Sequence, residues 1–438
     1  MNNQSVLGLT DYIAEIPRTV RIGKIVSTRG SLLIAQIPSA ALGEKCLINL
    51  KNSRHLEAQI VGFDGDYATL APFDYTDGVS PGAGVRSTGQ SPSVKISEAL
   101  IGKVVDAFGN PLEGDSIMAP ERSISAPSPN PLSRTPINQA LTTGVRALDA
   151  FCTIGYGQRL GLFAGAGVGK STLLGMIARN AEVDLAVIAL VGERGREVSE
   201  FINDSLGETG LRKSIVVVST SDQSPIKRQL GVETATAIAE HFRDKGKRVL
   251  LLVDSLTRAA RAIRDVSLSA GDVPVRQGYT TSVYTQLPRL LERAGNNAHG
   301  SITAIYTVLT AGTDEIDPLG EEVKSILDGH IVLDSKLAEL GIRPAISTAL
   351  SISRLFTKLN DANQVRNATS VLRALARLRK DKDILLFGGT PDEELKQILA
   401  VEDALLNFLT QRPYEKSSLD EARNWLSSLA ELVSKKRT

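Results

Sequence analysis

A glycine-rich stretch in the middle of the chain has the residue types and spacing of a phosphate-binding loop. It reads GLFAGAGVGKST over 161–172, with Ala164 where the strict pattern has glycine. Glycines let the backbone turn tightly and bring its N–H groups onto phosphate oxygens, and a following helix adds its positive end. Lys170 can then reach the β- and γ-phosphates, and the Ser171 hydroxyl can bind Mg²⁺. The predicted nucleotide-binding residues of the loop are Gly165, Ala166, Gly167, Val168, Gly169, Lys170, Ser171 and Thr172.

A purely structural glycine turn is the alternative for this stretch. The flanking pattern disfavours it, because the apolar run RLGLFA (159–164) comes before the loop and a helical pattern follows it. Strand, glycine loop and helix in this order are the context in which phosphate loops occur. The sequence therefore predicts a triphosphate site.

Two acidic residues stand where apolar runs end. Asp254 closes RVLLLVD (248–254), and Glu193 follows VIALV (187–191) after one glycine. Because ligands bind at the carboxyl ends of parallel strands, both acids are expected beside the phosphate loop. We expect Asp254 to orient Mg²⁺ through water and Glu193 to act as the general base on the attacking water. The alternatives are a helix cap for Asp254 and a solvated turn for Glu193.

Two arginines accompany the predicted base. Arg194 and Arg196 follow Glu193 directly in the run ERGRE. They balance the charge of the site, contact a neighbouring subunit, or remain solvated surface charges. Arg194 is included among the candidate catalytic residues.

The composition excludes several classes of protein. The 438 residues carry 50 Lys+Arg against 49 Asp+Glu, so no bulk attraction to nucleic acid is indicated. Cys46 and Cys152 are far apart in sequence, which suits a reducing, cytoplasmic location and argues against a disulfide framework. The first residues lack the pattern of a signal peptide, and no apolar run is long enough to span a membrane.

The chain divides into three predicted domains with different patterns. Residues 1–90 contain short β-type runs separated by turn residues, which indicate a small β-barrel, with a boundary expected at 78–93. Residues 91–345 alternate apolar runs with helical segments, which is typical of a parallel sheet covered on both faces. A Pro/Ser-rich stretch within them, 126–136, is expected to lie extended over the surface of this domain. Residues 346–438 are expected to be helical.

The C-terminal region carries two predicted helix starts. In TPDEE, Thr390 is the expected N-cap, Pro391 the first helical residue and Glu393 the partner in a capping box. In SLDEARNWLSSLAELV, Ser418 and Glu421 form the expected box, and an apolar stripe runs through Trp425, Leu429 and Leu432.

Taken together, these segments resemble the ATPases of bacterial type III secretion, which are relatives of the catalytic β subunit of rotary ATP synthases. The matching stretches are GLFAGAGVGKSTLL, LVGERGREVSEFI, FRDKGKRVLLLVDSLTRAARAIRDV, LPRLLERAGN, GSITAIYTVL and ILDGHIVL. The resemblance runs from about residue 20 to the C-terminus and is strongest over 134–354. It implies an α/β fold with a central RecA-like phosphate-loop sheet, flanked by an N-terminal β-barrel that mediates oligomerisation and a C-terminal all-helical domain.

The resemblance also implies a homohexamer with its sites between subunits, ATP as substrate and Mg²⁺ as cofactor. It carries over Lys170, Ser171, Glu193 and Asp254 in the roles given above. Arg354, in LSISRLF, corresponds to the finger that enters the adjacent subunit's site and stabilises charge in the transition state, with a salt-bridged surface arginine as the alternative. Arg258 corresponds to a second arginine near the site, whose role the resemblance leaves open.

One departure from the family pattern concerns the base of the nucleotide. The family commonly has an aromatic residue before the proline of GIRPAIS, where its ring lies against adenine, and this chain has Arg343 there. A guanidinium group can also stack on a flat ring. Tyr414, in FLTQRPYE, is the candidate for the other wall of the adenine pocket.

The function predicted from the resemblance is Mg-ATP hydrolysis that energises type III protein export, with chaperone release and substrate unfolding at the export gate. The implied partners are a central stalk, peripheral stator proteins and chaperone–effector complexes, and the implied place is the cytoplasmic side of the inner-membrane apparatus. The stretch VVVSTSDQSPIKR (216–228) resembles the virulence-type (injectisome) branch more than the flagellar one, which is the closest alternative. Three other functions are less favoured. A rotary synthase subunit would have an acidic rotor-facing loop in its C-terminal domain, which this chain lacks, and a non-catalytic ring subunit would not need Glu193. A nucleic-acid motor would need aromatic residues to stack bases, and these make up only 4% of the chain.

Overall fold

The computed structural model describes residues 22–51, 54–310, 317–386 and 390–434. The chain forms two compact units, one of residues up to 92 together with 265–272, and one of 93–264 together with 273 onward. The expectation about a signal peptide concerns residues outside the described ranges.

The first unit is built on a closed antiparallel barrel with the strand order β1-β2-β5-β4-β3-β6. The strands are β1 (Gly23–Arg29), β2 (Leu32–Gln36), β3 (Lys45–Asn49), β4 (His55–Asp64), β5 (Tyr67–Pro72) and β6 (Gly84–Ser87). Side chains alternate between the barrel interior and its surface, and Ile48, Ile60 and Leu70 fill the core. The barrel prediction is thus confirmed.

The boundary between the two units falls after Pro92, at the end of the expected stretch 78–93, and the earlier part of this stretch contains a barrel strand. β6 lies inside this stretch and pairs with both β1 and β3, so it closes the barrel. The sequence carries no clear strand signal here, because glycines and prolines surround β6 and Val85 is the only buried apolar residue in the strand.

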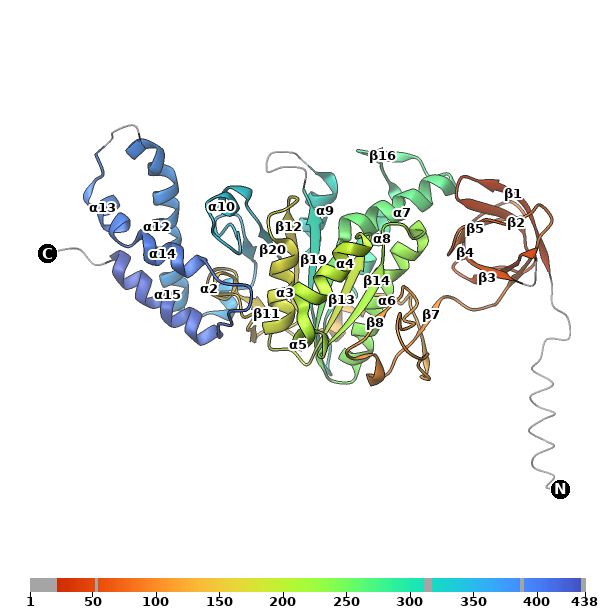
Figure 1. Cartoon of the computed structure of the whole chain (residues 1–438), viewed down its shortest axis with the longest axis horizontal. Helices are drawn as coiled ribbons and strands as arrows, with labels where there is room; N and C mark the ends of the chain where they lie inside the picture. Colours follow the sequence, from red (N-terminus) through yellow and green to blue (C-terminus); the bar gives the residue numbers. More distant parts are fainter. Residues whose placement is uncertain (1–21, 52–53, 311–316, 387–389, 435–438) are drawn as a thin grey trace, which may run out of the picture. The chain divides into compact units, whose positions relative to one another are not determined.

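A large, mainly parallel sheet forms the centre of the second unit, with the order β21-β20-β12-β19-β15-β13-β14-β8 and with β18 paired to β19 (Figure 1). Its strands are β8 (Val104–Val105), β12 (Arg159–Ala164), β13 (Leu185–Val191), β14 (Ser214–Ser219), β15 (Arg248–Asp254), β18 (Gly295–Asn296), β19 (Ser301–Leu309), β20 (Gly329–Val332) and β21 (Ile352–Ser353). The central strands are buried on both faces, which is why they read as unbroken apolar runs in the sequence.

Helices and small ribbons complete this part of the chain. The helices are α2 (Arg146–Phe151), α3 (Lys170–Asn180), α4 (Gly195–Glu200), a π-helical turn (Phe201–Leu206), α5 (Gly207–Leu211), α6 (Pro225–Asp244), α7 (Leu256–Ala270), α8 (Thr281–Leu291), α9 (Pro318–Ile326) and α10 (Ser335–Glu339). The ribbons pair β7 (Ser93–Lys95) with β9 (Glu121–Ser123), β10 (Ala140–Leu141) with β11 (Ile154–Gly155), and β16 (Pro274–Arg276) with β17 (Tyr279–Thr280). Short 3₁₀ turns lie at Glu98–Leu100 and Pro131–Ser133.

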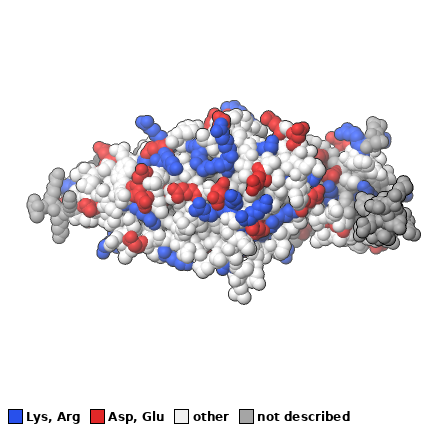
Figure 2. Space-filling view, turned by 90° about the horizontal axis from the view of Figure 1, so that it is seen from below, with Lys and Arg blue, Asp and Glu red and all other residues white. Residues whose placement is uncertain are grey.

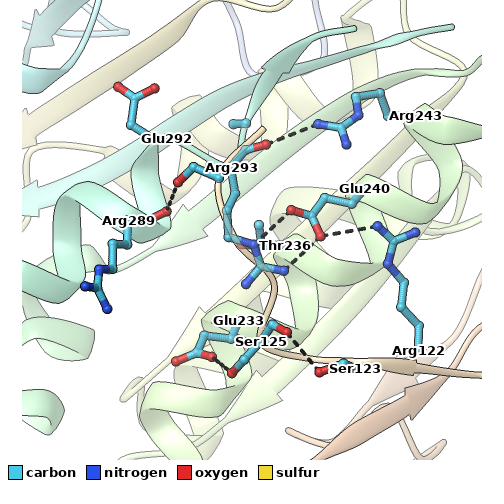
Figure 3. Close-up of polar contacts among 12 residues, drawn as sticks. Arg122, Ser123, Ser125, Glu233, Thr236, Glu240, Arg243, Arg289, Glu292 and Arg293 are labelled. Carbon is cyan, nitrogen blue, oxygen red and sulfur yellow. Dashed lines mark hydrogen bonds and ion pairs between the residues drawn. The ribbon is translucent and has the colours of Figure 1, made fainter. Parts of the chain in front are cut away.

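The Pro/Ser-rich connection 126–136 lies over the second unit and is extended, as predicted, except for the 3₁₀ turn Pro131–Ser133. Its polar groups bond to the last turn of α8 and to the segment that follows it: Ser128 Oγ donates to the Arg289 carbonyl at 3.2 Å, and Arg134 Nη1 donates to the Ala294 carbonyl at 2.7 Å. Just before it, Ser125 Oγ donates to Glu233 of α6 at 2.9 Å (Figure 3). These bonds replace the backbone pairing that prolines cannot make.

From Phe356 onward the C-terminal region is helical, as predicted, and its helices group beside α2 (Figure 1). The first part of the range expected to be helical, 346–438, instead contains β21, which pairs with β20 in the central sheet. The helices are α11 (Phe356–Leu359), α12 (Ala362–Leu386), α13 (Glu393–Ala400), α14 (Glu402–Leu409) and α15 (Leu419–Ser434). The Ser418–Glu421 capping box is confirmed by two bonds, from Ser418 N to Glu421 Oε2 at 2.7 Å and from Glu421 N to Ser418 Oγ at 3.2 Å.

Two details of the C-terminal prediction are wrong. Asp392, not Thr390, caps α13, because its carboxylate accepts from Leu395 N at 2.8 Å and the helix begins only at Glu393. In α15 the fully buried face runs through Ala422, Leu426, Leu429 and Ala430. Leu429 of the predicted stripe lies on that face, whereas Trp425 and Leu432, which are 38% and 42% exposed, lie at its edge.

Arg146 of α2 anchors the C-terminal helices to the nucleotide-binding part. Its buried guanidinium donates to the Phe408 carbonyl at 3.3 Å, pairs with Glu415 and lies 4.8 Å from the centroid of the Trp425 ring. Gln411 adds two bonds, accepting from Arg146 N at 2.9 Å and donating to the Gly144 carbonyl at 2.8 Å. The segment after α14 is thereby held against α2.

Both cysteines are free and buried. None of the described helices is both long enough and apolar enough to cross a bilayer. On the face drawn in Figure 2, positive and negative side chains are interspersed, with no field of one sign.

Candidate active site

The phosphate loop lies where the sequence predicts it, between the end of β12 at Ala164 and the start of α3 at Lys170. Gly167 and Gly169 have φ angles of 76° and 96°, a left-handed conformation that favours glycine. The loop lines a cavity of about 660 Å³, together with residues that follow β13 and β15. This volume is in the range of small-ligand sites.

Lys170 is held by the two predicted acids. Its Nζ pairs with Asp254 Oδ1 and lies 3.5 Å from Glu193 Oε1. Asp254 is buried at the end of β15, and Thr307 of the neighbouring strand β19 donates to the same carboxylate oxygen at 2.8 Å. The structure therefore brings the lysine and both carboxylates together from three different strand ends.

Glu193 stands two residues past the end of β13, after Gly192, at the cavity wall. Its Oε2 accepts from Arg258 Nη2 of α7 at 3.2 Å. Gly192 has a φ of 68°, and a Cβ there would lie 2.8 Å from Arg258 Cδ, so the close approach of Arg258 requires glycine. Burial, with a further contribution from Glu197, raises the pKa of Glu193 to about 7, whereas Lys170 and Arg258 act in the opposite direction. A carboxylate with this pKa can accept a proton near neutral pH.

Arg194 lines the cavity, but its side chain is 78% exposed and pairs with Glu197 at 2.7 Å. Arg196 pairs with Glu200 at 2.7 Å and is 87% exposed. Within one chain, both arginines are thus solvated and paired with nearby glutamates, and only Arg194 lines the cavity.

The donor set suits a magnesium ion bound together with phosphate. Ser171 offers a hydroxyl and Asp254 a carboxylate, and both line the same cavity. Mg²⁺ in nucleotide sites takes few protein ligands and completes its shell with water and phosphate oxygens. Among the described residues, no group of three or more His, Cys, Asp or Glu side chains could hold a metal ion by itself.

The candidates for the base-binding end lie near the loop. The Arg343 side chain is exposed, and its Nη1 lies 3.5 Å from where a Cβ on Gly169 would sit. Its carbonyl accepts from Gln411 N at 2.7 Å, which joins it to the segment that carries Tyr414. Tyr414 is 69% exposed and donates to the carbonyl of Asp204, a cavity residue, at 2.6 Å.

Arg354 does not line this cavity. It follows β21, whose last residue pairs with Gly329, the first residue of β20. Arg354 is therefore level with the start of β12, and the phosphate loop follows the other end of that strand, roughly 15 Å away along the strand direction. Its guanidinium is exposed and donates to the Lys324 carbonyl at 3.1 Å.

The sequence reasoning missed two contributors. Thr307 lies in the middle of an apolar run, and its hydroxyl became meaningful only once β19 was placed beside β15. Arg179, at the end of α3, lies 4.5 Å from the centroid of the Tyr414 ring and pairs with the Pro413 carbonyl. No motif marks either residue.

A glycine loop that opens a helix, faced by two acids at the ends of parallel strands, defines a phosphate-loop nucleotide-binding protein of the RecA-like class. The family models agree with this class. Residues 144–353 match the nucleotide-binding domain of the ATP synthase alpha/beta family, and residues 25–89 match the beta-barrel domain of the same family.

Whole-length relatives narrow the class. The chain is 43% identical to the flagellum-specific ATP synthase of Bacillus subtilis, over 98% of this chain and 99% of the relative, and 42% identical to the type 3 secretion system ATPase of Xanthomonas euvesicatoria, over 94% of each. The solved structure of the assembled ATPase EscN from the enteropathogenic E. coli type III secretion system superimposes with a TM-score of 0.86 at 41% identity, covering 93% of this chain and all of that one. The chain therefore belongs to the ATP synthase alpha/beta family, in the branch of flagellum-specific and type III secretion ATPases.

Proposed function

We propose that this chain hydrolyses Mg-ATP in a homohexameric ring and thereby energises type III protein export. The observation that carries the proposal is the grouping of Lys170, Glu193 and Asp254 around the cavity lined by the phosphate loop. A site that only holds nucleotide does not need a buried carboxylate with a raised pKa beside the lysine.

Each side chain has a proposed task. On nucleotide binding, Lys170 exchanges its contact with Asp254 for the β- and γ-phosphates, which frees Asp254 for the water shell of Mg²⁺. Ser171 is the proposed direct ligand of the ion, which supplies neutralisation of phosphate charge when bound. Glu193 accepts the proton of the attacking water, and Arg258 keeps its carboxylate oriented through their 3.2 Å contact.

The proposed site is completed by a second copy of the chain. Arg354 lies at the opposite end of the sheet from its own phosphate loop, so it can reach a triphosphate only in a neighbouring subunit. There the guanidinium would stabilise the transition state of phosphoryl transfer. Arg194, exposed at the cavity rim, is placed to meet the same neighbour.

The proposed domain roles follow the same scheme. Residues 1–90 form the oligomerisation barrel, 91–345 the ATPase domain and 346–438 the C-terminal helical domain. Near the base of the nucleotide, Arg343 and Tyr414 are proposed to flank adenine.

The export assignment rests on the relatives. The EscN structure has also been solved in complex with its central stalk EscO, at 41% identity to this chain and a TM-score of 0.85. We infer a comparable stalk for this chain, together with stator proteins, an export gate and chaperone–effector complexes, at the cytoplasmic face of the inner membrane. Relatives of the flagellar and injectisome branches match at nearly equal identity. The stretch 216–228 favours the injectisome, and flagellar export remains the second candidate. Deleting the gene and scoring effector secretion and swimming separately decides between them.

A shared site predicts that the rate of ATP hydrolysis per chain rises with protein concentration and reaches a plateau as rings form. The measurement is phosphate release per chain across a dilution series, with the mass of the particles followed in parallel. A rate that stays flat from dilute monomer upward would contradict the proposal.

A further inference from the structure

The backbone at Arg354 is held by little regular secondary structure. It follows β21, a strand of two residues at the edge of the sheet, and the Arg354 side chain is exposed. The backbone N–H of Arg354 donates to the Asp328 carbonyl at 3.0 Å. An exposed guanidinium that directly follows so short a strand needs a buried anchor if it is to be held in one place.

Gln158, in the turn before β12, makes that anchor. Its side chain is completely buried, and its amide nitrogen donates to the Asp328 carbonyl at 3.1 Å and to Ser353 Oγ at 3.0 Å. Its amide oxygen accepts from Gly155 N at 2.9 Å. Both N–H groups of the Gln158 amide thus donate to neighbours of Arg354. One acceptor is the Asp328 carbonyl, which also accepts from the Arg354 backbone N–H, and the other is the side chain of Ser353, the residue before Arg354.

The turn that leads into β20, at Asp328 and Gly329, is also held by contacts that do not involve Gln158. A Cβ on Gly329 would lie 2.3 Å from the Ile352 carbonyl, so this glycine lets β20 and β21 come together. The Asp328 carboxylate accepts from Arg159 N at 3.0 Å and Arg159 Nε at 3.3 Å, and Arg159 also pairs with Glu292 at 2.6 Å. The Asp328 carbonyl is therefore a rigid point, and Gln158 connects Ser353 to it.

We propose that Gln158 is a positioning residue for Arg354, and that it acts on the nucleotide site of the neighbouring subunit rather than on its own. The inference rests on the proposed shared site. Gln158 also precedes β12, which leads into its own phosphate loop, so an effect within the same chain is the competing explanation. The two explanations differ in which subunit of a ring loses activity when Gln158 is changed.

Gln158→Met keeps the length of the side chain and removes both donors. Because misplacing a catalytic group by about 1 Å can cost on the order of 100-fold, we expect kcat to fall by about 10- to 100-fold, with KM and the Kd for Mg-ATP within about twofold. Ser353→Ala removes only the outer acceptor and leaves the buried amide its other partners. It should lower kcat less, in the same direction, and it keeps the test open if Gln158→Met does not fold.

Mixed rings identify the subunit on which Gln158 acts. Lys170→Ala subunits have a disabled site and an intact Arg354, and Gln158→Met subunits have an intact site and a loosened Arg354. In random mixtures about one interface in four joins an intact site to an intact arginine. The measurement is the amount of Mg-ADP-aluminium fluoride trapped per chain, a transition-state analogue that does not require the ring to turn over. We expect the mixture to trap several times more than either variant alone.

The same mixture with Arg354→Ala in place of Gln158→Met serves as the reference. If the Arg354→Ala mixture recovers trapping and the Gln158→Met mixture does not, Gln158 acts within its own chain and the inference is wrong, whereas the shared site stands. If neither mixture recovers, Arg354 does not act across subunits, and both the shared site and the inference are overturned. A weaker Kd for Mg-ATP in Gln158→Met, with kcat unchanged, would likewise overturn the inference.

Discussion

The two ends of the nucleotide-binding sheet carry similar charged residues in opposite arrangements. At the carboxyl ends of the strands, Glu193 accepts from Arg258 at 3.2 Å, lies 3.5 Å from Lys170 Nζ, also contacts Glu197, and borders a cavity. At the amino ends, Glu240 of α6 receives two bonds from Arg293, at 2.8 and 2.9 Å, and lies 3.6 Å from Arg122 (Figure 3). Both members of the Glu240–Arg293 pair are almost completely buried.

This difference separates a structural pair from a reactive one. Glu240 has its lone pairs occupied by a guanidinium in parallel geometry, and the Arg293 carbonyl in turn accepts from Arg243 at 3.2 Å. Glu193 makes longer contacts, keeps room beside it for a substrate, and has a pKa raised to about 7, mainly by burial. Longer contacts beside a cavity and a raised pKa, rather than the presence of charge, distinguish the reactive end.

Glu193→Ala should have the largest effect on activity. Because general-base catalysis contributes about 10² to 10⁴ in rate, we expect kcat to fall by at least that factor, with Mg-ATP still bound. The measurements are phosphate release and the Kd for Mg-ATP. Glu208→Ala, which removes an exposed partner of Arg212 on α5, is the matched control and should keep its rate. Turnover of Glu193→Ala comparable to that control would contradict the assignment of the base.

Glu240→Ala should have the complementary effect. It leaves the Arg293 guanidinium buried without its carboxylate, which typically destabilises a protein by about 3–5 kcal/mol. Glu208→Ala, which breaks an exposed pair, should cost less than about 1 kcal/mol. Urea unfolding of both variants measures the difference. Equal midpoints would mean that the amino-end pair is not structural and that the contrast between the two ends is wrong.

The pH dependence of activity and of stability should reveal the raised pKa of Glu193 at the reactive end. Glu193 must be ionised to act as a base, so kcat/KM should rise with pH through about 7 in the free enzyme. Because its folded pKa lies above its ordinary value of 4.5, Glu193 favours the folded state most at low pH, and this contribution is lost as pH rises from about 4.5 to 7.

A neighbouring carboxyl supplies the control for this profile. Contact with Glu197 raises the pKa of Glu193 further, so Glu197→Gln should move the rise of kcat/KM to lower pH. If the pH profile of kcat/KM is unchanged in Glu197→Gln, or if the wild-type profile does not rise near pH 7, a group other than Glu193 controls the rise of kcat/KM with pH.

Much of the reactive end was predictable from sequence, because it depends on residues adjacent to regular elements. The phosphate loop, Glu193 and Asp254 each follow an unbroken apolar strand, so their place at the carboxyl edge follows from the parallel sheet alone. The amino-end pair was not predictable, since Glu240 and Arg293 are 53 residues apart and meet only through the packing of α6 on the segment after α8. For the same reason Thr307 and Gln158 were missed, and β6 was hidden by the glycines and prolines around it.

Arg343 gives the smallest of these effects and refines the contrast. The buried arginine of the amino end has a carboxylate partner, whereas in the described part of the chain the Arg343 guanidinium, which lies close to Gly169, has no carboxylate within salt-bridge distance. If it flanks the base, Arg343→Tyr replaces a weaker stacking group by an aromatic ring, and ATP should bind about two- to tenfold more tightly. Inorganic tripolyphosphate, which has no base, should bind within about twofold of the wild-type affinity, and competition with a fluorescent nucleotide measures both. Equal weakening of ATP and tripolyphosphate binding would instead assign Arg343 to the phosphates, and the reactive end would then contain a cation without a carboxylate partner beside the paired Lys170 and Arg258.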